Sequence, residues 1–227
     1  MSQLEKPFLQ AAETPLTLRE IVQQQLREAI IAGNFKPGER LVERPLCDQL
    51  GVSRTVIRET IRYLEAEGLV EILPNKGPIV ALMDWQDAQQ IYDIRLLLES
   101  SAVAECARLI SAEFEQELRG ALSEIEQAFK SADAKALIKS TTDFYKVIFE
   151  EAGHLIAWEI VQRLNGRISR LRVMTLSTAE RHVSGFSHMT AICEAIIGGD
   201  AHAARLAVET HITDAASIAK RLLASPD

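Results

Sequence analysis

Residues 43–78 read ERPLCDQLGVSRTVIRETIRYLEAEGLVEILPNKGP, and they dictate the local structure of the N-terminal third of the chain. A short helical segment leads to Gly51, which lacks a Cβ and therefore permits the left-handed backbone of a sharp turn. Ser53 is an N-cap residue for the helix that follows, and Gly68 ends that helix. Two short apolar runs then flank the turn-forming residues 74–78. This order predicts a helix-turn-helix followed by a β-hairpin, which is a winged helix-turn-helix.

The helix after Gly51 has two distinct faces. One is an apolar stripe formed by Val56, Ile57, Ile61 and Leu64, and the other carries Arg54, Arg58 and Arg62 at i, i+4 and i+8. On an arbitrary helix such a row is usually a solvated face with acidic neighbours. Here the turn, the cap, the hairpin and the arginines share one window of 36 residues. Together they favour a surface that binds double-stranded DNA.

The contacts to DNA follow from how such a unit docks. The N-terminus of the second helix enters the major groove, where small capping residues and a guanidinium belong. Arg58, one turn further, can pair with guanine edges or clamp a phosphate, and Arg44 is placed for the phosphate backbone. The tip of the hairpin suits the minor groove or a phosphate. The predicted DNA-binding residues are Arg44, Ser53, Arg54, Thr55, Arg58, Lys76 and Gly77.

The residues before this window complete the predicted domain. Residues 17–32 have apolar side chains at helical spacing, with Thr17 as the N-cap and Gly33 as the stop. Residues 40–42 are expected to form a short extended segment that pairs with a later strand. Residues 1–83 carry 10 Lys/Arg and 11 Asp/Glu, whereas the remainder carries 15 and 21, so most of the net charge of -7 lies in the C-terminal part. Local clustering, and not this total, governs a nucleic-acid surface.

From Asp84 onward strand signals disappear, and five or six amphipathic helices follow. Their breaks fall near Ser111, residues 132–133, Gly153, residues 177–178 and residues 198–199. The inward face of the first of these helices is predicted from Ile91, Ile94, Leu97 and Leu98. The expected fold is mainly α, with a winged helix-turn-helix domain over residues 1–82 and an antiparallel all-α bundle over residues 83–227.

Composition excludes several other classes of protein. No apolar run approaches the roughly 18 residues that cross a bilayer, and the N-terminus lacks a secretory pattern, so we expect a cytoplasmic protein with no membrane partner. The three cysteines, Cys47, Cys106 and Cys193, are far apart and suggest neither a disulfide framework nor a thiolate zinc site.

Several motifs closely resemble the GntR family of bacterial transcription regulators. They are residues 37–41 (PGERL), residues 50–55 (LGVSRT) with Arg58, and residues 64–70 (LEAEGLV) with Gly77. This resemblance implies DNA contacts at Arg44, Arg54, Thr55, Arg58 and Gly77.

The C-terminal part is similar to the FadR-type branch of that family, whose ligand-binding bundle is called FCD. The similarity lies in residues 91–95 (IYDIR), Leu98-Glu99, residues 194–196 (EAI), residues 199–200 and His211. It implies a two-fold dimer that binds a palindromic operator, with a small-molecule effector in the bundle that repositions the winged domains.

Many FCD bundles hold a divalent metal through one Asp and three His. In this chain those positions fall on Thr141, Tyr145, Met189 (or His188) and His211, which suit a divalent ion poorly. We therefore predict that no cofactor is required and disfavour a metal. A two-histidine remnant of His188 and His211, completed by water or the effector, stays as the alternative.

The predicted effector-binding residues are Arg95, Thr141, Tyr145, Met189 and His211. Arg95 is either a cation that attracts a carboxylate or phosphate, or the partner of Glu99 at i+4. His211 is either a ligand contact or a satisfied core histidine. Tyr145 in place of a metal ligand favours an organic effector held by hydrogen bonds and apolar contacts.

The expected function is a DNA-binding repressor that a small carboxylate-type effector releases, and not an enzyme. An enzyme within the bundle is the first alternative, but the chain has no Gly-rich phosphate loop, no Gly-x-Ser-x-Gly and no His-x-x-x-His. An architectural DNA-packing protein is the second. A DNA-packing protein neutralises many phosphates at once, which would need more basic residues than this chain has.

Overall fold

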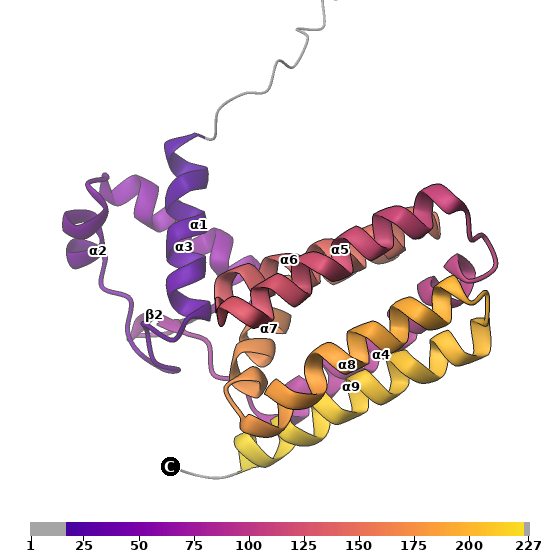
Figure 1. Ribbon diagram of the computed structural model, residues 1–227. Helices are drawn as coiled ribbons and strands as arrows, with labels where there is room; N and C mark the ends of the chain where they lie inside the picture. The colour runs from indigo at the N-terminus through magenta and orange to yellow at the C-terminus, as the bar shows by residue number, and fades with distance from the viewer. Residues whose placement is uncertain (1–16, 225–227) are drawn as a thin grey trace, which may run out of the picture.

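The computed structural model describes residues 17–224, except for the side chains of residues 179–183. It contains a small winged domain and a larger helical bundle, which lie side by side (Figure 1). The first 16 residues of the predicted DNA-binding domain and the last three of the bundle lie outside the described residues. The predicted fold class is confirmed.

Three helices form the body of the winged domain: α1 (Leu18–Ile31), α2 (Glu43–Leu50) and α3 (Arg54–Ala66). Thr17 and Glu20 form a reciprocal capping box at the start of α1, as the sequence predicts for Thr17. Gly51 has a φ of 66° and closes α2 in the left-handed conformation that the turn requires. Arg27 of α1 forms a bidentate ion pair with Glu67 at the end of α3, with N to O distances of 2.8 and 2.7 Å, so it ties the two helices together.

The wing is a two-stranded antiparallel sheet. Strand β1 (Val70–Leu73) pairs with β2 (Gly77–Val80), and the register joins Val70 to Val80 and Leu73 to Gly77. The extended segment predicted over residues 40–42 does pair with this sheet, because Arg40 bridges to Ile79 and the Leu41 N–H donates to the Pro78 carbonyl at 2.9 Å. The wing is therefore anchored to the chain segment that precedes α2.

Six helices follow the wing within the described residues: α4 (Trp85–Cys106), α5 (Ala112–Ser131), α6 (Ala134–Glu151), α7 (Leu155–Leu176), α8 (Ala179–Ile197) and α9 (Ala201–Ala224). The α5–α6 and α8–α9 hairpins are antiparallel, α4 packs on α9, and the pairs form two layers (Figure 1). Their apolar faces enclose one continuous core. All five predicted helix breaks match the observed loops.

The prediction that Leu97 of α4 faces the core was wrong. Leu97 is 72% exposed, whereas Arg95 and Glu99 are buried. The buried face of α4 runs through Ala88, Ile91, Tyr92, Arg95, Glu99, Ala102, Val103 and Cys106. The sequence-based assignment failed because this face includes a pair of charges, and a purely apolar pattern therefore selected a neighbouring stripe.

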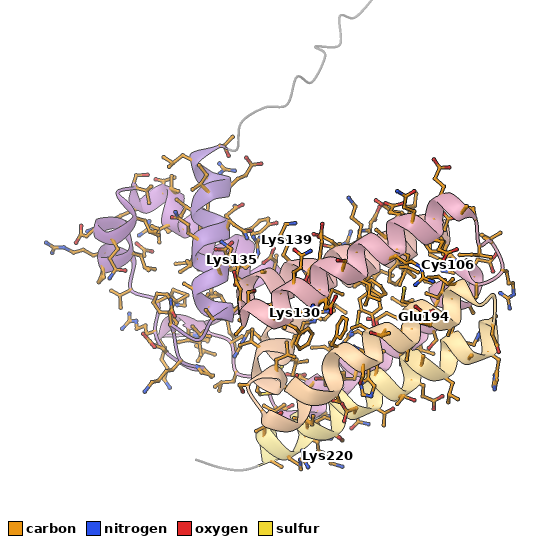
Figure 2. The ribbon with its side chains drawn as sticks, viewed as in Figure 1. Cys106, Lys130, Lys135, Lys139, Glu194 and Lys220 are labelled. Carbon is orange, nitrogen blue, oxygen red and sulfur yellow. The ribbon has the colours of Figure 1, made fainter. Side chains whose placement is uncertain are left out.

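Helix α7 lies between the winged domain and the rest of the bundle (Figure 1). Arg170 Nη1 donates to the Ala81 carbonyl at 2.8 Å, and a Cβ on Gly166 would come within 2.9 Å of the Leu69 side chain. A second contact comes from α6, where Lys135 pairs with Glu28 of α1 at 2.8 Å; Figure 2 shows Lys135 at the end of α6 that faces the winged domain. The predicted domain division falls in the linker between Val80 and Trp85.

Candidate DNA-binding surface and effector cavity

The N-terminus of α3 projects its polar residues into solvent. Ser53 caps the helix, because its Oγ accepts a hydrogen bond from the Val56 N–H at 3.4 Å. Arg54, Thr55 and Arg58 are all exposed, while Ile57 and Leu64 on the opposite face are fully buried. Four of the predicted contacts thus lie together on the open end of α3.

One arginine of the row forms an ion pair with another helix. Arg62 could have been neutralised by Glu59 or Glu65 on its own helix, but Glu59 pairs with Arg19 of α1 at 2.7 Å. Instead, Arg58 is held: its Nε donates to Glu43 Oε1 of α2 at 2.8 Å. Arg54 and Arg62 form no ion pair with any described residue.

The other predicted contacts flank α3. Arg44 is exposed in the first turn of α2, and Lys76 is exposed at the wing tip. Gly77 has a φ of 77°, and the Arg40 guanidinium lies beside it, since a Cβ there would be 3.8 Å from Arg40 Nη2. Sequence reasoning missed Arg40 as a cation of the wing, although its place in the pairing segment was a usable signal.

A small cavity lies within the bundle, with walls from all six helices α4 to α9. Its free volume is about 30 Å³, which is room for one or two water molecules. Four of the five predicted effector residues line it, namely Arg95, Thr141, Met189 and His211. The other wall residues are Tyr92, Phe129, Leu137, Arg172, Thr175, Leu176, Gly185 and Ala215.

Arg95 is the partner of Glu99, which is one of the two roles that the sequence left open, and it also borders the cavity. Its Nε and Nη2 donate to the two carboxylate oxygens of Glu99, at 2.7 and 3.3 Å, and both side chains are buried. Burial alone would lower the pKa of Arg95, but the Glu99 carboxylate outweighs it and raises that pKa above its ordinary value. Arg95 therefore stays charged while it borders the cavity.

Arg172 of α7 is a second guanidinium on the cavity wall, and sequence reasoning missed it. Its Nη1 donates to Thr142 Oγ1 of α6 at 3.4 Å. The signal was present, because Arg172 stands four residues after Ile168 and next to Leu171, two apolar residues at helical spacing. A cation at that helical position has to face the bundle interior.

Tyr145 lies beside the cavity and not on its wall. Its hydroxyl is buried and has no hydrogen-bond partner among the described residues. Burial, together with the nearby Glu99 carboxylate, raises the pKa of this phenol well above its usual range, so it stays protonated. Tyr145 thus offers a neutral O–H donor close to Arg95.

The donors at the four family metal positions do not fit a divalent ion. The Thr141 hydroxyl is engaged with the Leu137 carbonyl at 2.6 Å, Tyr145 is a neutral phenol, and the wall position on α8 is taken by the Met189 thioether. His188 instead stacks edge-on against His211, with ring centroids 5.9 Å apart, and its Nδ1 lies 3.7 Å from Asp214 Oδ2. Among the described residues no group of three or more His, Cys, Asp or Glu is arranged to hold a metal.

Comparisons with known proteins match two separate segments of the chain. Residues 18–80 match the gntR family of bacterial regulatory proteins, and residues 90–214 match the FCD domain. An HTH-type transcriptional regulator of Streptomyces ambofaciens is 27% identical over 86% of this chain and 82% of its own length. The regulator YdhC of Bacillus subtilis is 30% identical over 69% of this chain and 70% of its own length. Among solved structures, McbR/YncC of E. coli superposes with a TM-score of 0.75 at 22% identity, covering 91% of this chain and 99% of that one.

These features define a winged-helix DNA-binding protein with an all-helical ligand-binding domain. The chain belongs to the GntR family of transcriptional regulators and carries an FCD domain, as its motifs predicted. No helix in the described part of the chain has the length and apolarity that spanning a membrane requires.

Proposed function

We propose that this protein is a homodimeric repressor that binds a palindromic operator in the cytoplasm and is released by a small organic acid. The observation that carries the DNA-binding part is the exposed group Arg54, Thr55 and Arg58 at the capped N-terminus of α3. A second subunit is supported by apolar side chains left in solvent on α4 and α7, where Leu97 and Ile156 are 72% and 76% exposed. Two subunits would present two recognition helices to two half-sites.

The acidic nature of the effector is supported by the two guanidinium groups on the cavity wall. Arg95 and Arg172 approach the cavity from α4 and α7, and a carboxylate is the group that guanidinium donors bind in bidentate fashion. The Tyr145 hydroxyl supplies a further donor nearby. Phe129, Leu176 and Met189 supply apolar contact for the carbon skeleton.

The small size of the cavity suggests how binding is transmitted. A free volume of about 30 Å³ is too small for an organic acid, so the walls must move apart when it binds. Arg172, Thr175 and Leu176 of the moving wall belong to α7, the helix that contacts the winged domain through Gly166 and Arg170. A shift of α7 therefore changes the position of the winged domain relative to the bundle, and with it the spacing of the two recognition helices.

We propose that this response needs no metal, since the Thr, Tyr and Met donors do not replace an Asp and two His. A metal-assisted His188 and His211 site is the alternative. Elemental analysis of the purified dimer is expected to give well under one equivalent of zinc, nickel or manganese per chain. Stoichiometric metal that dialysis against a chelator removes together with ligand binding would favour the alternative.

The experiment that tests the proposal has two stages. The purified protein first selects duplexes from a random-sequence DNA pool, and we expect the selected DNA to contain an inverted repeat. A panel of small mono- and dicarboxylates is then screened for release of that duplex by fluorescence anisotropy, with the matching amides as controls. Failure to enrich any sequence would refute the DNA-binding part, and release by amides as readily as by acids would refute the carboxylate part.

A further inference from the structure

Glu43 occupies an unusual place for an acidic residue in a DNA-binding domain. It is the first residue of α2, and its Oε1 accepts a hydrogen bond from Arg58 Nε of α3 at 2.8 Å. Within the described residues this is the one ion pair that joins α2 to the recognition helix. The Arg58 hydrogen bond, and further off the Arg54 charge, hold the pKa of Glu43 below its ordinary value, so the carboxylate is ionised at neutral pH.

The pair does little for stability, which makes another role the better explanation. The Arg58 side chain is 64% exposed and that of Glu43 is 30% exposed, and ion pairs this open contribute little to folding. A carboxylate beside a phosphate-binding surface also opposes DNA binding in general, because it repels the polyanion. Its position has to be explained through Arg58.

The atom that Glu43 engages decides what Arg58 can still do. A guanidinium has five N–H donors in a rigid planar fork, and only the Nε–H is engaged by Glu43. The outer edge, formed by Nη1 and Nη2, stays available for two parallel hydrogen bonds. That edge matches the O6 and N7 acceptors of guanine in the major groove.

We propose that Glu43 is a positioning residue that fixes Arg58 for base readout and makes sequence discrimination sharper. This inference rests on the proposed DNA-binding function. By holding Nε, Glu43 restricts the rotamers of Arg58 before DNA arrives, so less side-chain freedom is lost at the operator. Its negative charge simultaneously weakens binding to any phosphate backbone where no guanine lies opposite Arg58. The two effects together raise the ratio of specific to nonspecific affinity.

The test compares Glu43→Gln with Asp48→Asn in the full-length dimer. Both substitutions remove one negative charge from α2, but Asp48 forms no ion pair with α3. The probes are a duplex that the wild-type protein selects from a random pool and a scrambled duplex of equal composition. Affinities are measured by fluorescence anisotropy over a series of salt concentrations. We expect Glu43→Gln to lower the ratio of the two affinities at least tenfold, whereas Asp48→Asn changes it less than twofold.

A double-substitution cycle separates positioning from a general electrostatic effect. In an Arg58→Ala background, Glu43→Gln is expected to leave the remaining discrimination unchanged, because its target side chain is gone. The thermal midpoint of each variant should match its parent within about 1 °C, which shows that folding is intact. Three results would overturn the inference: an unchanged ratio in Glu43→Gln, an equal fall in Asp48→Asn, or a further fall in the Arg58→Ala background. If the wild-type protein selects no sequence at all, the proposed function fails instead.

Discussion

The two domains use charged side chains in opposite ways. In the winged domain the charges that matter are open to solvent, as in the Arg58 to Glu43 pair, where Arg58 is 64% exposed. In the bundle they are inside, as in the Arg95 to Glu99 pair, where the side chains are 6% and 2% exposed. An exposed pair costs little to build and leaves the outer edge of the guanidinium open to DNA. A buried pair has been taken out of water, so both members depend on each other for stability.

This contrast explains why one site was readable from the sequence and the other only in part. On α3 the arginines and the apolar stripe lie on different faces of the helix. The helical period of 3.6 residues therefore distinguishes the predicted DNA-binding face from the core. On α4, Arg95 and Glu99 share the buried face with Ile91 and Tyr92, and the pattern led to Leu97 instead. A site inside a bundle interrupts the very pattern by which helices are oriented from sequence.

The largest effect is expected from breaking the buried ion pair of Arg95 and Glu99. Glu99→Leu leaves the Arg95 guanidinium buried without its carboxylate, and we expect a loss of about 3–5 kcal/mol in the free energy of unfolding. Urea denaturation followed by circular dichroism measures it. The double variant Arg95→Met/Glu99→Leu removes both charges and should recover most of the loss.

The matched control for that prediction is Arg119→Ala, which breaks exposed pairs with Glu115 and Glu194 and should leave the denaturation midpoint almost unchanged. Equal losses in Glu99→Leu and Arg119→Ala would erase the difference between a buried and an exposed ion pair. The double variant should also lose its response to carboxylates, because Arg95 borders the cavity.

How far sequence alone reaches is clearest at the helix ends. Gly51, Gly153 and Gly199 all have positive φ and end helices where the pattern predicted a break. Such ends depend on one residue and its neighbours, so they can be identified without the fold. The local pattern of α7 could have indicated that Arg172 faces inward, but its place on the cavity wall depends on α7 packing against α4 and α6, which no local window contains.

The second prediction tests the solvent-exposed Arg58 of the winged domain. Arg58→Ala removes the guanidinium that faces solvent beside Glu43, and we expect specific affinity for the selected duplex to fall roughly 10- to 100-fold for each half-site. The dimer should stay folded, since the Arg58 side chain is mostly exposed. Anisotropy and analytical ultracentrifugation report the two properties separately. Full retention of sequence discrimination would show that α3 does not read the operator.

The smallest effect concerns the junction where the two domains meet, and two glycines provide a matched pair. Gly51 and Gly68 have φ values of 66° and 69°, so an alanine at either position adopts a strained left-handed backbone that costs about 1–2 kcal/mol. A Cβ on Gly51 meets nothing within 4 Å, whereas a Cβ on Gly68 would overlap the Arg167 guanidinium of α7.

Because that guanidinium ends a flexible side chain, it can move aside at little further cost in stability. We therefore expect Gly51→Ala and Gly68→Ala to lower the free energy of unfolding by similar amounts. Only Gly68→Ala should alter the carboxylate concentration that releases half of the bound duplex, because it disturbs the contact between α7 and the winged domain. If both variants keep the wild-type release curve, α7 does not transmit the state of the cavity, and the two domains respond to their ligands independently.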